Sequence, residues 1–527
     1  MCFQSTITAA TLRVFLPQWQ PLLYRDEQSD PKRYRDACSI PKALGRGRSS
    51  GWDPMTQRTP ITGPRRPRSS AFVVIHTVIS YTASSAFASG LEGQGSVTAD
   101  LGVSNTVALL GLSLFVLGYG MGPMVLHPIS DVPSIGRLPV YLVSQILATI
   151  FSVPCAIAPN IGTLLISRYL QGLFSSPPLA TGGATLGDMW TPGPLAYALA
   201  CWGFGAVVGP AVGPILGGYI YSAGGWRCIM WALLALNGLL LLWMVFMMPE
   251  TSGAAILYRR ACRLEKQFPG HVFTTAAMIE LRREGIQAIL VEALWRPFEL
   301  IPEPTLLVYN VYLALVYRMF YLFFEAFPVV FGEIRGFSPR QSGLAFLGVA
   351  VMATLMLLFY CVWLYRVMNP VIENNGGINP LPELRLALTP YAAAAISVAL
   401  FGFGWTGQSA SIHWIAPVIF SGLFACGGIA SFQTIFAYLG DVYFKEIGFV
   451  LTLNDLFRGS YAAGFPLFAH ALYTNLGVGP ACSLLGAISV LFIPVPIICI
   501  KYGKAIRARS KWASKIGIEP LPGEERD

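Results

Sequence analysis

Five charged residues lie inside stretches of this sequence that are otherwise apolar: Arg168, Arg318, Glu325, Asp455 and Arg458. A charged side chain at the centre of a bilayer costs about 2.5–3.5 kcal/mol on insertion scales, so each one requires a compensating role. Such groups face a water-filled cavity, bind a substrate, carry protons or pair with one another. We interpret Arg168 as a functional residue and keep a functional and a structural role open for Glu325. The spacing of Asp455 and Arg458 favours a structural ion pair on one helix.

Aromatic residues are concentrated in the same apolar stretch as Arg318 and Glu325. Tyrosine and phenylalanine rings bind flat apolar compounds and cations, although such runs also serve to pack helices together. We take Tyr321 and Phe324 as candidate residues of a substrate cavity. The predicted cavity residues are therefore Arg318, Tyr321, Phe324, Glu325, Asp455 and Arg458.

Histidine and cysteine patterns give no sign of enzymatic or metal chemistry. The 5 histidines form no HExxH motif, no GxSxG motif is present, and the 10 cysteines form no CxxC pair. His76 lies in the first apolar stretch, where a hydrogen-bonded structural histidine is more common than a titrating one. We expect no metal site and no cofactor other than a proton gradient, and we expect the protein not to be an enzyme.

The segment 203–218 (GFGAVVGPAVGPILGG) has glycine at every fourth position. Such glycines form a stripe on one side of a helix, where another backbone can approach closely. Prolines inside the segment remove helical hydrogen bonds, but neighbouring membrane helices can satisfy the freed carbonyl groups. Two interpretations remain open: a helix that bends and slides against a partner, or close packing without motion. The stripe consists of Gly205, Gly209, Gly213 and Gly217, with Pro210 and Pro214.

The composition places most of the chain in a membrane. Hydrophobic residues make up 54% and charged residues 12% of the 527 residues, against about 25% charged residues in soluble domains. Twelve apolar segments approach the length of about 20 residues that a helix needs to span a bilayer. We predict these spans at 71–91, 106–128, 138–158, 161–185, 195–221, 226–248, 304–330, 340–365, 386–405, 412–438, 447–470 and 480–502.

Basic residues lie almost entirely on one side of the predicted spans. The loops that we assign to the outside carry one basic residue, Arg335, whereas both terminal segments and the loop 249–303 are rich in Lys and Arg. The positive-inside rule then places both termini in the cytosol. This distribution accounts for the net charge of +9 and argues against a nucleic-acid partner. We expect a monomeric multi-pass protein that lies in the lipid bilayer of the plasma membrane.

We predict an all-α membrane protein with 12 transmembrane helices in two pseudo-symmetric six-helix bundles. A short repeat supports two related halves, because Gly187-Asp188-Met189-Trp190 ends the fourth span and Gly440-Asp441-Val442-Tyr443 ends the tenth. Part of the central loop, at 258–267, has a helical pattern. The predicted segments are a disordered basic cytosolic tail (1–70), the first bundle (71–248), a cytosolic central loop (249–303), the second bundle (304–502) and a basic cytosolic tail (503–527).

Several motifs resemble those of the fungal 12-span drug:proton antiporters of the major facilitator superfamily, of the benomyl/fluconazole-resistance type. The resemblance covers about residues 71–515. It includes the glycine–proline segment in the fifth span. The other motifs are SDVPSIGR at 130–137, SSPPLATGG at 175–183, PET at 249–251, FFEAFP at 323–328, NDLFR at 454–458 and KYG at 501–503.

The resemblance implies roles for three groups of residues. It implies proton coupling by Arg168, Gln171 and Gly172. It implies a cytosolic gating loop of Asp131, Gly136 and Arg137 with Asp188 as charge partner, and an antiporter motif of Gly205, Gly209, Pro210 and Gly213. The sequence departs from the family pattern at His127, where the superfamily loop usually has glycine, and at Arg318, where a small residue is more usual.

The resemblance therefore implies a secondary active transporter that exports small apolar or cationic compounds, such as drugs, fungicides or toxins, in exchange for protons by alternating access. Proton-coupled uptake and polyamine export by the same fold remain alternatives. A membrane-embedded enzyme would need clustered catalytic groups, and a receptor would need an output domain; neither is evident in the sequence.

Overall fold

The computed structural model describes the chain from residue 65 to residue 513, with short gaps. Residues 1–64 of the predicted tail 1–70, residues 514–527 of the predicted tail 503–527, and His271 lie outside the described residues. Within the described part, every regular element is a helix, as the predicted fold class requires. The described ranges are 65–91, 93, 95–190, 192–268, 273–375, 381–443 and 446–513.

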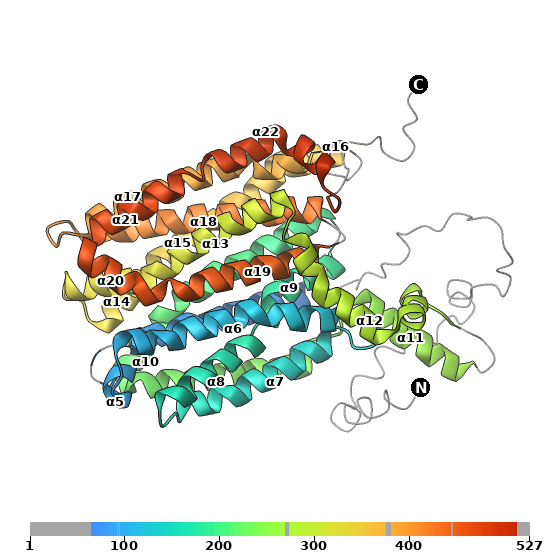
Figure 1. Ribbon diagram of the computed structural model, residues 1–527, viewed down its shortest axis with the longest axis horizontal. Helices are drawn as coiled ribbons and strands as arrows, with labels where there is room; N and C mark the ends of the chain where they lie inside the picture. Colours follow the sequence, from blue (N-terminus) through green and yellow to red (C-terminus); the bar gives the residue numbers. More distant parts are fainter. Residues whose placement is uncertain are drawn as a thin grey trace.

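The first half of the chain forms the lower bundle in Figure 1, in blue and green. Its helices lie side by side with their long axes parallel to the long axis of the view. They are α4 (Arg65–Ser85), η3 (Ala86–Gly90), α5 (Val97–Leu101), α6 (Asn105–Asp131), α7 (Arg137–Ala156), α8 (Ile161–Phe174), α9 (Pro177–Met189) and α10 (Pro192–Met247).

Two helices of the central loop, α11 (Gly253–Gln267) and α12 (Ala276–Leu300), lie at one end of the molecule, which we call the linker end (right in Figure 1). The opposite end, with α5 and α14, is the far end. The upper bundle, in yellow to red, contains α13 (Pro304–Phe327), η4 (Pro328–Glu333), α14 (Pro339–Ala345), α15 (Leu347–Trp363), η5 (Leu364–Met368), α16 (Asn369–Asn374), η6 (Pro382–Leu388), α17 (Thr389–Gly407), α18 (Ile415–Val442), α19 (Ile447–Gly464), α20 (Pro466–Leu476), α21 (Val478–Val490) and α22 (Pro494–Arg509).

Each of the twelve predicted spans coincides with helices of the described chain, but their boundaries differ. Nine described helical segments are individually long and apolar enough to cross a membrane. One of them, α10, contains the fifth and sixth spans, joined at Gly224 and Gly225, whose backbone angles are not helical. The predicted fourth and eleventh spans are each divided into two shorter helices, and the second helix begins at a proline (Pro177 and Pro466), which has no N–H to continue the preceding helix.

The observed helix boundaries also differ from the predicted ones at the two tails and in the central loop. Helix α4 begins at Arg65, before the predicted limit of the tail at residue 70, and α22 continues to Arg509, beyond the predicted end of the last span. Helix α11 includes the stretch 258–267 that the sequence predicted as helical, whereas α12 was not predicted.

The glycine stripe of α10 packs directly against α4, and the two helices approach at the level of their backbones. A Cβ atom built on Gly209 would lie 2.8 Å from the carbonyl oxygen of Val78, and one on Gly213 would lie 2.7 Å from the backbone nitrogen of Ala86. These distances are too short for any side chain, so the close approach predicted from the spacing is confirmed. Helix α10 stays helical through both prolines of the stripe.

We therefore expect Gly213→Val to lower the stability of the folded protein by about 1–3 kcal/mol, as overpacked cores do. The added side chain must push α4 away from α10. The melting temperature of the detergent-solubilised protein measures this loss. Gly238→Val is the matched control on the same helix, because nothing lies within 4 Å of its Cβ position. An equal loss of stability in both variants would contradict this explanation.

At the far end of the molecule, α10 meets the second bundle, again without side chains between the backbones. A Cβ atom on Gly218 would lie 2.6 Å from the carbonyl oxygen of Pro339 in α14, and one on Gly343 would lie 2.5 Å from that of Pro214. The far end of the molecule is thus closed by direct contact between backbones of the two halves.

Two arginines stabilise the far ends of corresponding helices in the two halves. Arg227 donates hydrogen bonds to the carbonyl oxygens of Ala156 (3.4 Å) and Ala158 (3.1 Å) at the end of α7. Arg335 donates to those of Thr406 (2.8 Å) and Gly407 (3.0 Å) at the end of α17. A cation at a helix C-terminus is favourable because the unpaired carbonyl groups there carry partial negative charge.

Candidate functional site

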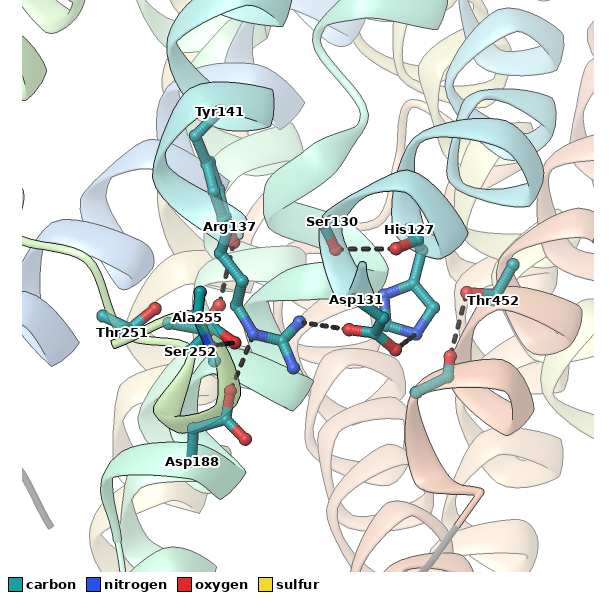
Figure 2. Close-up of polar contacts among 12 residues, drawn as sticks. His127, Ser130, Asp131, Arg137, Tyr141, Asp188, Thr251, Ser252, Ala255 and Thr452 are labelled. Atoms are coloured by element: carbon teal, nitrogen blue, oxygen red, sulfur yellow. Dashed lines mark hydrogen bonds and ion pairs between the residues drawn. The ribbon is translucent and has the colours of Figure 1, made fainter. Parts of the chain in front are cut away.

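An ion-pair cluster at the linker end joins three helices of the first half. Arg137, at the start of α7, lies between two carboxylates: its Nε is 2.7 Å from Asp188 at the end of α9, and its Nη1 is 3.3 Å from Asp131 at the end of α6 (Figure 2). Gly136, the residue before Arg137, has φ +80°, a backbone conformation that favours glycine. The structure thus brings all four predicted gating residues together.

Glu250 attaches the central loop to this cluster. Its Oε1 accepts hydrogen bonds from the backbone N–H groups of Arg137 (3.1 Å), Thr251 (3.0 Å) and Ser252 (3.0 Å). Its Oε2 lies 3.4 Å from Nη1 of Arg259 on α11. A carboxylate at the N-terminus of a helix also complements the helix dipole, so Glu250 fixes α7 and α11 to one another.

His127 extends the cluster toward the second half. Its Nε2 lies 3.4 Å from Asp131, on the side of α6 that packs against α19 (Figure 2). The imidazole ring is fully buried and meets the ring of Phe449 edge to face, at 5.4 Å between ring centroids. The residue that departs from the family pattern therefore forms part of the contact between the two halves at the linker end.

The second half carries an equivalent ion pair at the repeated sequence motif. Arg385 Nε lies 3.0 Å from Asp441, which occupies the position of Asp188 in the predicted repeat. Next to it, Arg507 makes two hydrogen bonds to Glu383, at 2.8 and 3.1 Å. The pseudo-symmetry predicted from two short motifs is therefore present in the contacts that those motifs make.

Arg168 is completely buried between α4, α6 and α8. Its Nε donates to the carbonyl oxygen of Gly111 (3.2 Å), and its Nη1 donates to that of Ala83 (3.2 Å) and to Oε1 of Gln171 (3.1 Å). Its Nη2 donates to the carbonyl oxygen of Ser84 (3.4 Å). Its described partners are therefore neutral oxygens from three helices, and none of them is a carboxylate.

Aromatic rings and a glycine complete this arginine site. The guanidinium carbon lies 4.7 Å from the ring centroid of Phe87 and 4.4 Å from that of Phe115, contacts that stabilise a desolvated cation. Gln171 also donates to Ser152 on α7 at 2.7 Å. A Cβ atom on Gly172 would lie 2.9 Å from the carbonyl carbon of Phe115, so only glycine lets α8 approach α6 here.

Four tyrosines from both halves, which we call the tyrosine cluster (Tyr81, Tyr119, Tyr317 and Tyr321), meet at the centre of the molecule. The Tyr119 hydroxyl on α6 hydrogen-bonds the hydroxyls of Tyr317 and, at 3.0 Å, of Tyr321 on α13. The Tyr321 hydroxyl also lies 3.0 Å from Oγ of Ser84 on α4. Because Ser84 accepts from Arg168 through its carbonyl group, the cluster continues to the arginine site.

The ion pair of Asp455 and Arg458 lies on the other side of the tyrosine cluster. The two side chains form a direct, fully buried hydrogen-bonded pair on α19, as the spacing predicted. Arg458 also donates to the hydroxyl of Tyr81 on α4 at 3.1 Å. The pair therefore belongs to the contact between the two halves.

A cavity opens beside this ion pair, between α4 and α10 of the first half and α13, α18 and α19 of the second. The space in it that the centre of a water molecule can occupy is about 20 Å³, so in this conformation the cavity is small. Its wall is mostly aromatic and aliphatic, and Arg458 is the only charged residue among its lining residues in the described chain. The aromatic lining residues are Tyr81, Trp202, Tyr317, Phe320, Phe424, Phe432 and Phe436.

Of the six predicted cavity residues, Arg458 lines this cavity. Tyr321, Asp455 and Phe324 contact residues that line it. Phe324 also packs against Phe346, between α14 and α15, at 5.6 Å between centroids. Arg318 lies 3.6 Å from the ring centroid of Phe465 at the start of α20. The cavity roles of the residues away from the wall remain predictions.

Glu325 and His76 are both buried. Glu325 lies on α13. His76 hydrogen-bonds the side chain of Gln145 through Nε2 at 3.1 Å, the contact expected of a structural histidine.

The sequence reasoning missed Glu250 as an anchor and missed Tyr81, Tyr119 and Tyr317 as parts of the central network. Hydroxyl-bearing rings in apolar spans were the available signal, because a buried tyrosine requires a hydrogen-bond partner. The sequence does not say which helix supplies that partner.

Comparison with known proteins agrees with this architecture. The model of the Major Facilitator Superfamily matches residues 73–466. Transporter mfs1 of Schizosaccharomyces pombe is 38% identical over 440 residues, covering 82% of each chain. Fluconazole resistance protein 1 of Saccharomyces cerevisiae is 36% identical over 449 residues, covering 84% of this chain and 80% of its own.

The structure of the xylose transporter XylE from E. coli superimposes with a TM-score of 0.57, at 12% identity, over 83% of this chain and 99% of its own. At that identity the likeness concerns the fold alone. Two related helical bundles, a cavity between them and sequence identity along most of the chain lead to one conclusion: this chain is a multi-pass membrane transporter of the major facilitator superfamily, from its fungal 12-span drug:proton antiporter family.

Proposed function

We propose that this transporter exports small, mostly apolar compounds in exchange for protons. The cavity between the two bundles is the observation that carries the proposal. Aromatic walls favour flat apolar compounds, and the described lining residues include no carboxylate that would bind a cationic cargo. The resistance named for the yeast relative supports export, since a cell resists a drug by removing it.

Alternating access would use the two closures described above. In transporters of this superfamily the cargo site lies near the midplane between two rocking halves. Here the two halves contact one another both at the linker end and at the far end, so the cavity is closed from both sides. We infer that Arg137 with its carboxylates controls the linker end, and that the glycine–proline segment controls the far end.

The distribution of basic residues supports an orientation for the protein. We infer that the linker end, with α11, α12 and the basic end of α22, faces the cytosol, together with both termini. We further infer a plasma-membrane location and action as a monomer in lipid. The division into segments at 71–248, 249–303 and 304–502 is our proposal for its domains, with terminal segments at 1–70 and 503–527.

Transport by the purified protein in liposomes tests this function. With an imposed pH gradient, we expect radiolabelled fluconazole, a neutral aromatic compound, to move opposite to the proton flow and to accumulate on the acidic side. Movement in the same direction as the protons would instead establish proton-coupled uptake. Preferential transport of spermidine over fluconazole would favour a polyamine exporter and would contradict the cavity argument.

A further inference from the structure

We propose that Asp455 is the carboxylate that carries the exchanged proton, and that its protonation expels the cargo by leaving Arg458 as a net charge in the cavity wall. The proposal rests on the proton exchange proposed above and assigns it to one residue. The proposal is based on the position of the Asp455 carboxylate, which is buried between the two halves. One of its oxygens accepts no hydrogen bond, and its ion-pair partner, Arg458, lines the cavity.

The two oxygens of Asp455 have different surroundings. Oδ1 is bound by Nη2 of Arg458, whereas Oδ2 is buried and has no hydrogen-bond partner. The side chain as a whole is 2% exposed. A buried oxygen that lacks a donor is costly, and binding a proton there removes the negative charge that causes the cost.

Asp455 lies where both halves can change its access to water. Its own helix, α19, packs against α6 so closely that a Cβ atom on Gly120 would lie 2.8 Å from Cα of Gly459 and 3.1 Å from the carbonyl oxygen of Asp455. This contact belongs to the interface along which the two halves separate. A proton can therefore enter from one side and leave to the other.

The groups facing the ion pair are uncharged tyrosines, apart from Arg458 itself. They come from the helices packed around α19: Tyr81 from α4, Tyr119 from α6, and Tyr317 and Tyr321 from α13. Arg458 donates to Tyr81 and lies 4.8 Å from the ring centroid of Tyr317. Helix α9 also packs against α19, and its one carboxylate, Asp188, is held by Arg137 at the linker end.

Helix α13, which also packs against α19, carries two charged residues. Arg318 lies 3.6 Å from the ring centroid of Phe465 at the C-cap of α19, and Glu325 is buried.

Two further charged groups contact α19 at the linker end. His127 of α6 meets Phe449, and Arg296 of α12 lies 3.5 Å from Glu446. Both contacts precede Asp455 by six or more residues of helix, roughly 9 Å at 1.5 Å per residue. Of these carboxylates, Asp455 is the one whose ion-pair partner, Arg458, lines the cavity.

Protonation changes the cavity in a defined way. With Asp455 ionised, the pair has no net charge, and the aromatic cavity suits an apolar cargo. When a proton forms an O–H bond at Oδ2, the carboxyl group becomes neutral and Arg458 remains as an uncompensated cation. Such a cation in an apolar site requires water, which competes with the cargo. Proton and cargo thus occupy the site in turn, as exchange requires, and loss of the proton on the other side restores the neutral pair.

The experiment compares three proteins in nanodiscs by fluconazole binding as a function of pH. For the wild type, we expect binding to weaken at least tenfold as pH falls, with protons released into weakly buffered solution when fluconazole binds. Asp455→Asn retains Arg458 without its counter-charge, so we expect weak binding at every pH. The double variant Asp455→Asn/Arg458→Gln has a neutral wall, so we expect tight binding at every pH without proton release.

Transport in liposomes gives the second measurement. We expect the double variant to lose the accumulation of fluconazole that the pH gradient drives, and to exchange labelled for unlabelled fluconazole at a rate that no longer changes with pH. Glu284→Gln, at an exposed carboxylate on α12, is the control and should behave as the wild type.

Three results would overturn the assignment. One is wild-type binding without proton release, which needs no variant to fold. A second is pH-dependent binding and gradient-driven accumulation retained by Asp455→Asn. A third is loss of the gradient response by Glu325→Gln while the double variant keeps it, which would place the proton at Glu325. If the wild type itself shows no gradient-driven transport, the proposed exchange fails, and this result is distinct from all three.

Discussion

Replacing Arg168 with alanine should abolish proton-driven export while leaving the protein inserted in the membrane. The guanidinium joins α4, α6 and α8 through four hydrogen bonds to neutral oxygens. Hydrogen bonds to charged groups contribute about 1.5–3 kcal/mol each, so the variant loses the interactions that hold Ser84 beside the tyrosine cluster. Gradient-driven fluconazole transport in liposomes measures the loss, and we expect less than about 1% of wild-type transport.

The lysine variant separates charge from geometry at this site. An ammonium group keeps the charge but cannot bind oxygens from three helices in the planar arrangement of a guanidinium. We therefore expect Arg168→Lys to transport poorly as well. Its melting temperature should lie between those of Arg168→Ala and the wild type. Full transport by Arg168→Ala would remove this residue from the mechanism.

The second large effect is expected at the linker end, where Arg137→Gln should open the contact between the halves. Arg137 holds the end of α6 through Asp131, and that end carries His127, which packs on α19. Without the guanidinium, Asp131 and Asp188 repel one another, and α6 can move away from α19. Transport should fall at least tenfold, because the protein then favours a single state.

Cysteine labelling measures this opening directly. Thr452 is buried on α19 near His127 (Figure 2). With the 10 native cysteines replaced and Thr452→Cys introduced, we expect a water-soluble maleimide to react about tenfold faster when Arg137→Gln is present. Arg227→Gln, a change at the far end, should leave the rate unchanged. Equal rates with and without Arg137→Gln would show that this ion-pair cluster does not hold the linker end closed.

The order and the approximate positions of the apolar helical segments could be predicted from the sequence because apolar length and loop charge are local properties of the chain. The close packing of α10 was also predictable, since a four-residue glycine spacing has one geometric consequence on a helix. The divisions at Pro177 and Pro466 were missed because prolines within membrane helices are often tolerated, and only the neighbouring helices decide whether the helix continues.

The contacts within the site were less predictable than its residues. The pairing of Asp455 with Arg458 follows from their spacing, and Asp188 was recognised through a motif. The tyrosine cluster, in contrast, depends on how each helix is rotated about its axis, which the sequence of one chain does not specify. The same holds for Arg318, which contacts Phe465, and for Glu250, whose partner Arg137 lies 113 residues away.

The two closures of the cavity differ in their physical nature. At the far end, Gly218 and Gly343 meet carbonyl groups of the opposite half, and these contacts carry no formal charge. At the linker end, closure depends on carboxylates and guanidinium groups, and because the carboxylates of Asp131 and Asp188 are about one-third exposed, dissolved ions weaken these pairs in part. Changes in ionic strength on the two sides of the membrane should therefore have unequal effects: added electrolyte loosens the linker end and leaves the far end nearly unaffected.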